Sequence, residues 1–197
     1  MRLILATQNI DKISEIKALI SNLPVEILTQ DQLSDFPNTI EDKNSLKGNA
    51  EKKAKNVWKK FKLPVVADDT GLFVDYLNGQ PGVKSSRYAG ENATYKQNRE
   101  KLLKELHGVS PIERGAKFRT VLVFIDEDGV THYFMGVCKG FISEKESGDK
   151  GFGYDSLFHP LQSNKSFSQL TSQEKNEISH RGIAMRKFRD FLKKNIS

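Results

Sequence analysis

The sequence is short of cysteine and of long apolar stretches. Its 197 residues include a single cysteine, Cys138, so the chain cannot form an internal disulfide, and a reducing, cytoplasmic location is expected. No apolar run approaches the roughly 20 residues that a transmembrane helix needs. The first residues, "MRLILATQN", are too few for a signal peptide and lead directly into a strand-like pattern. These absences favour a cytoplasmic protein that has no membrane partner.

Internal repeats, low-complexity linkers and a basic tail are also missing. The chain carries 31 basic and 25 acidic side chains, for a net charge of +6. This excess indicates either a solvated, lysine-rich surface or a positive field that attracts nucleic acid or a small polyanion such as a nucleotide. Neither paired zinc ligands nor an aromatic RNP strand is present, so the sequence contains no recognisable nucleic-acid module. The charged fraction of 28% against 37% apolar residues is typical of a globular fold rather than a disordered chain.

Strand-like and helix-like segments alternate at both ends of the chain. The predicted strands are 2–6, 25–28 and 64–67, and the predicted helical segments are 7–20, 45–61 and 95–108. Two β-rich runs around "DEDG" predict a hairpin within 116–142. Thr171 and Glu174 stand at capping-box spacing, and predict a short helix that leads through "SHRG" into a last helix ending near Lys194. The predicted class is α/β with a mixed β-sheet flanked by helices, in which ligands bind beyond the ends of strands.

Residues 7–12, "TQNIDK", follow the first predicted strand and open a helix. Thr7, Asn9 and the backbone N–H groups of the helix start are suited to hold a phosphate, and Lys12 adds a full charge. The segment lacks the glycines of a P-loop. The alternative interpretation is a helix cap by Asn9 followed by a surface lysine.

Asn49 and Lys53 are four residues apart in the second predicted helix, so they project from one face. That face differs from the apolar stripe that contains Trp58. Glu41 precedes the same helix. Nothing local indicates more than a solvated face for this pair.

The stretch "VVADDTGL" places Asp68 and Asp69 at the end of a buried strand, with "LFVDYL" as a candidate continuation. Two carboxylates there suit a hard cation such as Mg²⁺. Alternatively, one aspartate is a ligand and the other a structural acceptor, or both only cap the loop. Adjacent strand residues point to opposite faces. This alternation predicts that one aspartate faces the site and the other turns into the scaffold.

The fourth polar cluster is "GFGYDSLFHP", followed by "SHRG". Its glycines allow close backbone approach, and Phe152 and Tyr154 offer aromatic faces. Asp155 adds a carboxylate, and His180 and Arg181 lie between two helical segments. The combination suits a nucleobase pocket, but core packing at a bend would use the same residues.

Taken together, "TQNIDK", "ADDTGL", "GQPGVKSSRYAGE", "GFGYD" and "SHRG", in this order and spacing, resemble the inosine/xanthosine triphosphate pyrophosphatase family. Each motif alone is weak, but all five in register are specific, and the resemblance runs from about residue 3 to about residue 190. It implies an elongated, two-lobed α/β fold over residues 1–197, with the active site in the cleft between the lobes. It further implies hydrolysis of non-standard purine nucleoside triphosphates (ITP, dITP and XTP) to monophosphate and pyrophosphate, a Mg²⁺ requirement and a homodimer.

The resemblance also implies roles for individual residues. Asp69 would be the catalytic acceptor of a proton from water and a metal ligand together with Glu41, and Lys53 would face the phosphates. The other implied substrate contacts are Thr7, Gln8, Asn9, Ile10, Asp11, Lys12, Thr70, Phe152, Gly153, Tyr154, Asp155, Lys175, His180 and Arg181. Arg181 carries only donors and would prefer the C6 oxygen of hypoxanthine to the amino group of adenine.

The chain departs from the family pattern at a few positions. Thr70 stands for a serine and keeps the hydroxyl group, and Gly48 stands where many members have glutamate. Lys84, Ser86 and Ser156 replace a tyrosine, an alanine and a proline, respectively. The competing hypotheses are a related pyrophosphatase that acts on pyrimidine or modified nucleotides, and a basic nucleic-acid-binding protein without catalysis.

Overall fold

A computed structural model describes residues 1–195. The main elements are β1 (Arg2–Leu5), α1 (Ile10–Ile20), β2 (Glu26–Leu28), α2 (Leu46–Phe61), β3 (Val65–Val74), α3 (Tyr95–Glu105), β4 (Gly115–Ile125), β5 (Thr131–Ile142), β6 (Phe158–Pro160), α4 (Ser172–Ile178) and α5 (His180–Asn195). Short 3-10 helices lie at η1 (Gln30–Gln32), η2 (Gly82–Arg87), η3 (Pro111–Glu113) and η4 (Phe167–Gln169). Among these residues, no helix combines the length and hydropathy that crossing a bilayer requires.

Within residues 1–195 the strands form one sheet in the order β2-β1-β3-β4-β5-β6. β1 pairs in parallel with β2 and with β3, whereas β5 and β6 are antiparallel. The predicted α/β class with a mixed sheet is therefore confirmed. The predicted hairpin is confirmed as well, because β4 and β5 are neighbours joined by a short turn.

The chain divides into two compact units. The first contains Met1–Asp69, Thr120–Gly136 and the chain from Arg181 on, and the second contains Thr70–Arg119 and Val137–His180. Each unit has its own apolar core.

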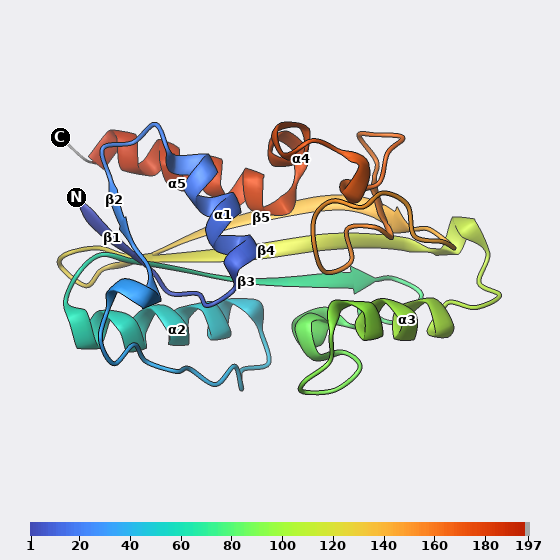
Figure 1. Cartoon of the computed structure of the whole chain (residues 1–197), viewed down its shortest axis with the longest axis horizontal. Coiled ribbons are helices and arrows are strands. Elements are labelled where there is room, and N and C mark those ends of the chain that lie inside the picture. The colour runs from blue at the N-terminus through green and yellow to red at the C-terminus, as the bar shows by residue number, and fades with distance from the viewer. Residues whose placement is uncertain (196–197) are drawn as a thin grey trace. The chain divides into compact units, whose positions relative to one another are not determined.

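The first unit packs helices on both faces of its strands. Figure 1 shows α1 and α5 on one face of β1, and α2 on the other. Its core includes Leu3 and Leu5 of β1, Ile16 of α1 and Phe188 of α5. Because both faces of the strands are covered, β1 is a nearly continuous apolar run rather than an alternating one.

α2 begins at a cap that the sequence provides. The Ser45 side chain accepts a hydrogen bond from the Gly48 backbone N–H at 3.0 Å. Its buried stripe includes Leu46, Ala50, Ala54 and Val57, and also the polar Asn49. A buried amide needs partners, and those of Asn49 lie in the candidate site described below.

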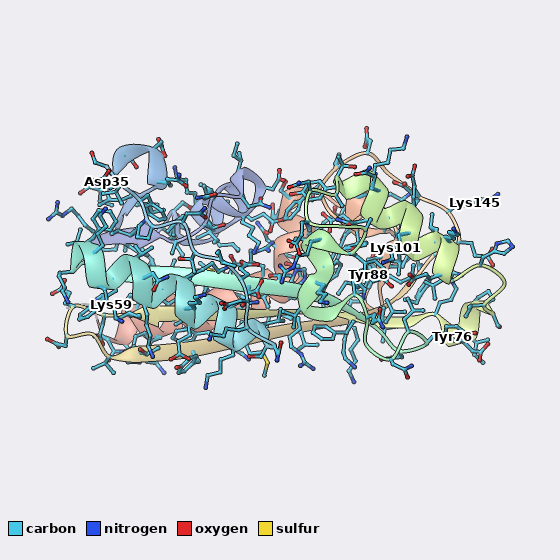
Figure 2. All side chains as sticks on the ribbon, turned by 90° about the horizontal axis from the view of Figure 1, so that it is seen from below. Asp35, Lys59, Tyr76, Tyr88, Lys101 and Lys145 are labelled. Carbon is cyan, nitrogen blue, oxygen red and sulfur yellow. The ribbon has the colours of Figure 1, made fainter. Side chains whose placement is uncertain are left out.

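The second unit has α3 and α4 on opposite faces of its strands (Figure 1). Its core includes Leu102 of α3, Phe118 of β4 and Phe158 of β6, and the last two rings meet edge to face at 4.8 Å. Figure 2 shows Tyr88 and Lys101 side by side. Lys101 Nζ donates to the Tyr88 carbonyl at 2.7 Å and lies 4.3 Å from the centre of its ring, which ties α3 to the chain after η2.

The structure corrects one predicted boundary. β3 does not stop at the aspartate pair but continues to Val74, so the candidate continuation belongs to the same strand. Gly71 permits this, because a Cβ there would collide with the carbonyl of Gly82. β6 and the 3-10 helices η1 to η4 were not anticipated from the sequence.

Candidate active site

Asp68 and Asp69 lie within β3 and send their side chains to opposite faces. Both are buried, with 1% and 5% of their surface exposed. The Asp68 carboxylate contacts residues of α1 and α5, and the Asp69 carboxylate contacts α2. The alternation predicted for adjacent strand residues is thus confirmed, and it gives the two carboxylates different surroundings.

Asp68 is surrounded by cations. Lys12 Nζ lies 3.1 Å from its Oδ2 and Arg181 Nη2 lies 3.4 Å from the same atom. Arg181 is also paired with Glu15 of α1. Burial opposes the charge of Asp68, but Lys12, Arg181 and Lys53 outweigh it and hold the pKa of Asp68 well below its ordinary value. Asp68 is therefore a charged anchor for the basic side chains around it.

Asp69 has the opposite balance. Asn49 Nδ2 donates to its Oδ2 at 3.1 Å, and Asn49 Oδ1 accepts from the Lys43 N–H at 2.9 Å. Burial raises the pKa of Asp69 above its ordinary value, and the attraction of Lys53 and Lys12 offsets this only in part. A buried carboxylate with a raised pKa is a better proton acceptor than an exposed one.

Lys53 reaches from α2 to the same place. Its Nζ donates to Glu41 Oε1 and to the Asp68 backbone carbonyl, both at 2.6 Å. Burial disfavours the charge of Lys53, but Asp69, Glu41 and Asp68 together raise its pKa. The ammonium group therefore stays charged among hard oxygen acceptors.

The predicted Mg²⁺ ligands are Glu41 and Asp69. Glu41 is bonded to a cation, the Lys53 ammonium, and the charge of Asp69 also acts on that ammonium. Both residues offer carboxylate oxygens, the hard donors that Mg²⁺ prefers. No group of three or more His, Cys, Asp or Glu side chains suited to a metal occurs among residues 1–195. Mg²⁺ commonly binds through one or two carboxylates and keeps several waters. The donor set therefore fits Mg²⁺ with few protein ligands.

The predicted phosphate segment, residues 7–12, forms the end of β1 and the start of α1. Asn9 is the N-cap, as predicted, since its Oδ1 accepts from the Lys12 N–H at 3.1 Å. The Asn9 N–H in turn lies 3.3 Å from Thr7 Oγ1. Gln8 and Ile10 are exposed, and Thr7, Asn9, Asp11 and Lys12 are half-buried. The segment brings Lys12 to Asp68, and part of its backbone donor capacity serves the cap.

The second unit contains the loop "GFGYD". Asp155 Oδ2 accepts from the Phe152 N–H and from Lys175 Nζ, both at 2.8 Å. Lys175 also lies 5.0 Å from the centre of the Phe152 ring. The structure therefore brings together Phe152, Asp155 and Lys175, three of the predicted substrate contacts. A pocket of about 140 Å³ lies beside the loop, lined by Phe152, Gly153 and Asp155 among others.

Two predicted substrate contacts of this region, Tyr154 and His180, have packed surroundings, which agrees with the alternative of core packing at a bend. The Tyr154 ring does not offer a face to a ligand, because it is buried in the core of the second unit and its hydroxyl donates to the Ser85 carbonyl at 2.8 Å. His180 is buried and stacks on Phe118 at 4.6 Å, so its ring has a packing role. An aromatic residue near small residues has the same local pattern in a core as in a pocket. Thr70, next to Asp69, is half-buried.

Sequence reasoning underestimated the α2 face and missed a contact in α1. The face that carries Asn49 and Lys53 is not solvated, since both side chains point at the aspartates. Their spacing of four residues was the available signal. No sequence signal indicated the contact between Glu15 and Arg181, because the two residues are 166 positions apart. Gly48 is explained by packing, since a Cβ there would lie 2.9 Å from the Cβ of Lys43.

Solved structures with the same fold include proteins from two bacteria. A HAM1 protein from Coxiella burnetii has a TM-score of 0.89 and 35% identity, and covers 98% of this chain and 99% of its own. The Ham1 protein of Staphylococcus aureus has a TM-score of 0.88 and 33% identity, and covers 99% and 100%. The fold thus places the chain among Ham1-type α/β proteins.

The chain belongs to the Ham1 family, whose model matches residues 3–191. The resemblance predicted from the motifs is therefore confirmed. A protein from Thermoanaerobacter pseudethanolicus named dITP/XTP pyrophosphatase is 43% identical and covers 100% of this chain and 98% of its own length. A protein of the same name from Geobacter sulfurreducens is 41% identical over 97% of this chain and 96% of its own.

Proposed function

We propose that this chain hydrolyses non-standard purine nucleoside triphosphates, such as ITP, dITP and XTP, to the nucleoside monophosphate and pyrophosphate. The observation that carries the proposal is the division of Asp68 and Asp69 between two charge environments, with Lys12, Lys53 and Arg181 converging on them. Full-length relatives named dITP/XTP pyrophosphatase support the same activity.

In this proposal the cations of the first unit bind the triphosphate. Lys12 and Lys53 come from different helices and stay close to the aspartates, so they can stabilise negative charge on the phosphates and on the leaving pyrophosphate. Arg181 is engaged by Glu15 and Asp68, and this position favours a contact with phosphate rather than with the C6 oxygen of the base. Arg181 therefore remains a proposed substrate-binding residue, but one that binds phosphate instead of the base.

Asp69 is the proposed catalytic residue. Asp69 is buried at the site and the Asn49 hydrogen bond holds its orientation, so its carboxylate can accept a proton from the water that attacks the α-phosphorus. Asp69 and Glu41 would hold Mg²⁺, which supplies positive charge to the phosphate oxygens and lowers the pKa of bound water. The bond that breaks is the anhydride between the α- and β-phosphates.

The "GFGYD" loop and Lys175 form the proposed base site. The Phe152 ring offers an apolar face beside the pocket, and Lys175 lies close to that ring. The lysine ammonium has only donors, so it can bond the C6 oxygen of hypoxanthine or xanthine but not the amino group of adenine. A polar group left unpaired by the wrong base costs binding energy. We further propose that the enzyme is a cytoplasmic homodimer, as the family resemblance implies.

The deciding experiment measures pyrophosphate release from ITP, XTP and dITP beside ATP, GTP, UTP and dTTP, with Mg²⁺ and with EDTA. We expect release from the first three, dependent on Mg²⁺. Asp69→Asn is the control, because it keeps the size of the side chain and should lower turnover by roughly a hundred- to ten-thousandfold. Preference for a pyrimidine triphosphate, or salt-dependent nucleic-acid binding without any pyrophosphate release, would replace this proposal.

A further inference from the structure

Arg99 links α3 to the tip of the "GFGYD" loop. Its Nη1 donates to the Gly153 carbonyl at 3.0 Å, and its Nε lies 2.8 Å from Glu146 Oε2. One turn earlier on the same helix, the Tyr95 ring lies 5.9 Å from the Phe152 ring. Arg99 and Tyr95 are therefore two contacts from one helix face to one loop.

The helix that carries Arg99 is itself fixed. Asn98, with 2% of its surface exposed, accepts from the Ala89 N–H at 2.8 Å and donates to the Ser86 carbonyl at 3.0 Å. Together with the Lys101 contacts to Tyr88, the residue labelled beside it in Figure 2, these bonds hold α3 against η2 and the segment that follows it. Arg99 thus extends from a rigid support.

The loop is held by hydrogen bonds on either side of Gly153, whereas no side chain of the described residues packs against Gly153 itself. Asp155 binds the Phe152 N–H and Lys175 on one side, and its own carbonyl accepts from the Ser168 N–H at 3.2 Å. Gly153 has φ +62°, and no atom lies within 4 Å of the place where a Cβ would be. The Gly153 peptide lies in a turn closed by the Asp155 N–H and the Phe152 carbonyl at 3.2 Å, and the Arg99 guanidinium is the side chain that holds its carbonyl oxygen from outside the turn.

Glu146 completes the arrangement. Its Oε2 accepts from the Ser156 hydroxyl at 2.7 Å, at the far end of the loop, while it pairs with Arg99. Burial opposes the charge of Glu146, but the hydrogen bond from Ser156 and the positive charge of Arg99 keep its pKa below the ordinary value. The carboxylate thus orients the guanidinium and ties it to a second point of the loop.

We propose that Arg99 is a positioning residue for residues 151–156, and that through the Gly153 carbonyl, with Glu146 and Ser156 as its support, it sets how well the loop distinguishes one purine from another. The effect on base discrimination rests on the proposed function. The immobilisation of the loop by Arg99 can be measured without any substrate. Arg99 and Glu146 also line the pocket beside the loop, so a shift of either changes the shape of that pocket.

Arg99→Met tests the proposal, since it keeps an extended side chain and removes all five donors. Lys104→Met is the matched control, because it removes one positive charge from an exposed position on the same helix. Circular dichroism establishes that each variant is folded. Steady-state kinetics with ITP and GTP, and hydrogen exchange of the amides of 150–157, are then compared with the original protein.

For Arg99→Met we expect the KM for ITP to rise about five- to tenfold. This is less than for a fully buried charged hydrogen bond, because solvent partly screens Arg99. kcat should stay within about twofold. The preference for ITP over GTP should fall by a similar factor, and the loop amides should exchange faster. A loss of positive charge alone would weaken both triphosphates equally, so the ratio separates positioning from electrostatics. Arg99→Lys should restore part of the preference, because lysine can bond the Gly153 carbonyl or Glu146 but not with the same fork.

An unchanged ITP-to-GTP ratio together with unchanged exchange would overturn the proposal. If the original protein releases no pyrophosphate from ITP, the proposed function fails, and hydrogen exchange alone decides whether Arg99 holds the loop. If Arg99→Met does not fold, Arg99→Lys and Glu146→Gln carry the same comparison. The proposal is supported if the amides of 150–157 exchange faster in these two variants than in the original protein while Lys104→Met exchanges at the original rate. It is refuted if the two variants exchange at the original rate as well.

Discussion

Neutralising Asp68 should mainly lower stability, whereas neutralising Asp69 should mainly lower activity. In Asp68→Asn the half-buried Lys12 and the buried Arg181 lose their shared counter-charge. Removing one partner of a buried ion pair costs about 3–5 kcal/mol, because the remaining charge is left uncompensated. For a chain of this length each kcal/mol lowers Tm by roughly 2–4 °C. The expected loss is therefore about 6–20 °C.

Asp69→Asn should change Tm little. The fold raises the pKa of Asp69, so burial already disfavours its charge, and Lys53 keeps its pairing with Glu41 after the substitution. We expect a change in stability within about 1 kcal/mol, together with nearly complete loss of pyrophosphate release. Asp68→Asn should instead lose stability first, with activity falling as the cations shift.

The assay is thermal and urea unfolding of both variants at pH 7, followed by a pH series. The fold lowers the pKa of Asp68, so its stabilising contribution is present above its ordinary value of 3.8 and is lost as the pH falls through the lower folded-state value. The stability gap between the original protein and Asp68→Asn should therefore narrow below about pH 4. Equal losses of Tm in the two variants, or a gap that is independent of pH, would refute the division of roles between Asp68 and Asp69.

Three further outcomes follow from individual contacts. Lys12→Ala should raise the KM for a triphosphate roughly tenfold, with a smaller effect on inhibition by the monophosphate product; equal effects would place Lys12 away from the phosphates. Burial raises the pKa of the Cys138 thiol to about 12, so it should resist a disulfide reagent at pH 8 until the protein unfolds, and rapid labelling of the folded chain would contradict its burial. Gly71→Ala would press a methyl group against the carbonyl of Gly82 and should cost about 1–3 kcal/mol in urea unfolding, whereas an unchanged midpoint would mean that the two segments separate easily.

Local sequence patterns were sufficient for several parts of the fold and the site. The period of two along β3 predicted that Asp68 and Asp69 would face different surroundings, and they do. The Asn9 cap, the capping box at Thr171 and the hairpin around "DEDG" were predicted because each depends on residues only a few positions apart. The five motifs in register also identified the family.

Other features depended on which surfaces pack together. The face of α2 that carries Asn49 and Lys53 looks solvated in sequence, but it is buried because it packs against β3 and its aspartates. Tyr154 has the same neighbours whether its ring fills a core or lines a pocket, and the Ser85 carbonyl, 69 residues away, decides for the core. Arg181 pairs with Glu15 across 166 residues, a separation at which neither helical nor strand periodicity carries information. These contacts arise from the tertiary packing of distant segments, and for that reason the charge environment of the site could be known only from the folded chain.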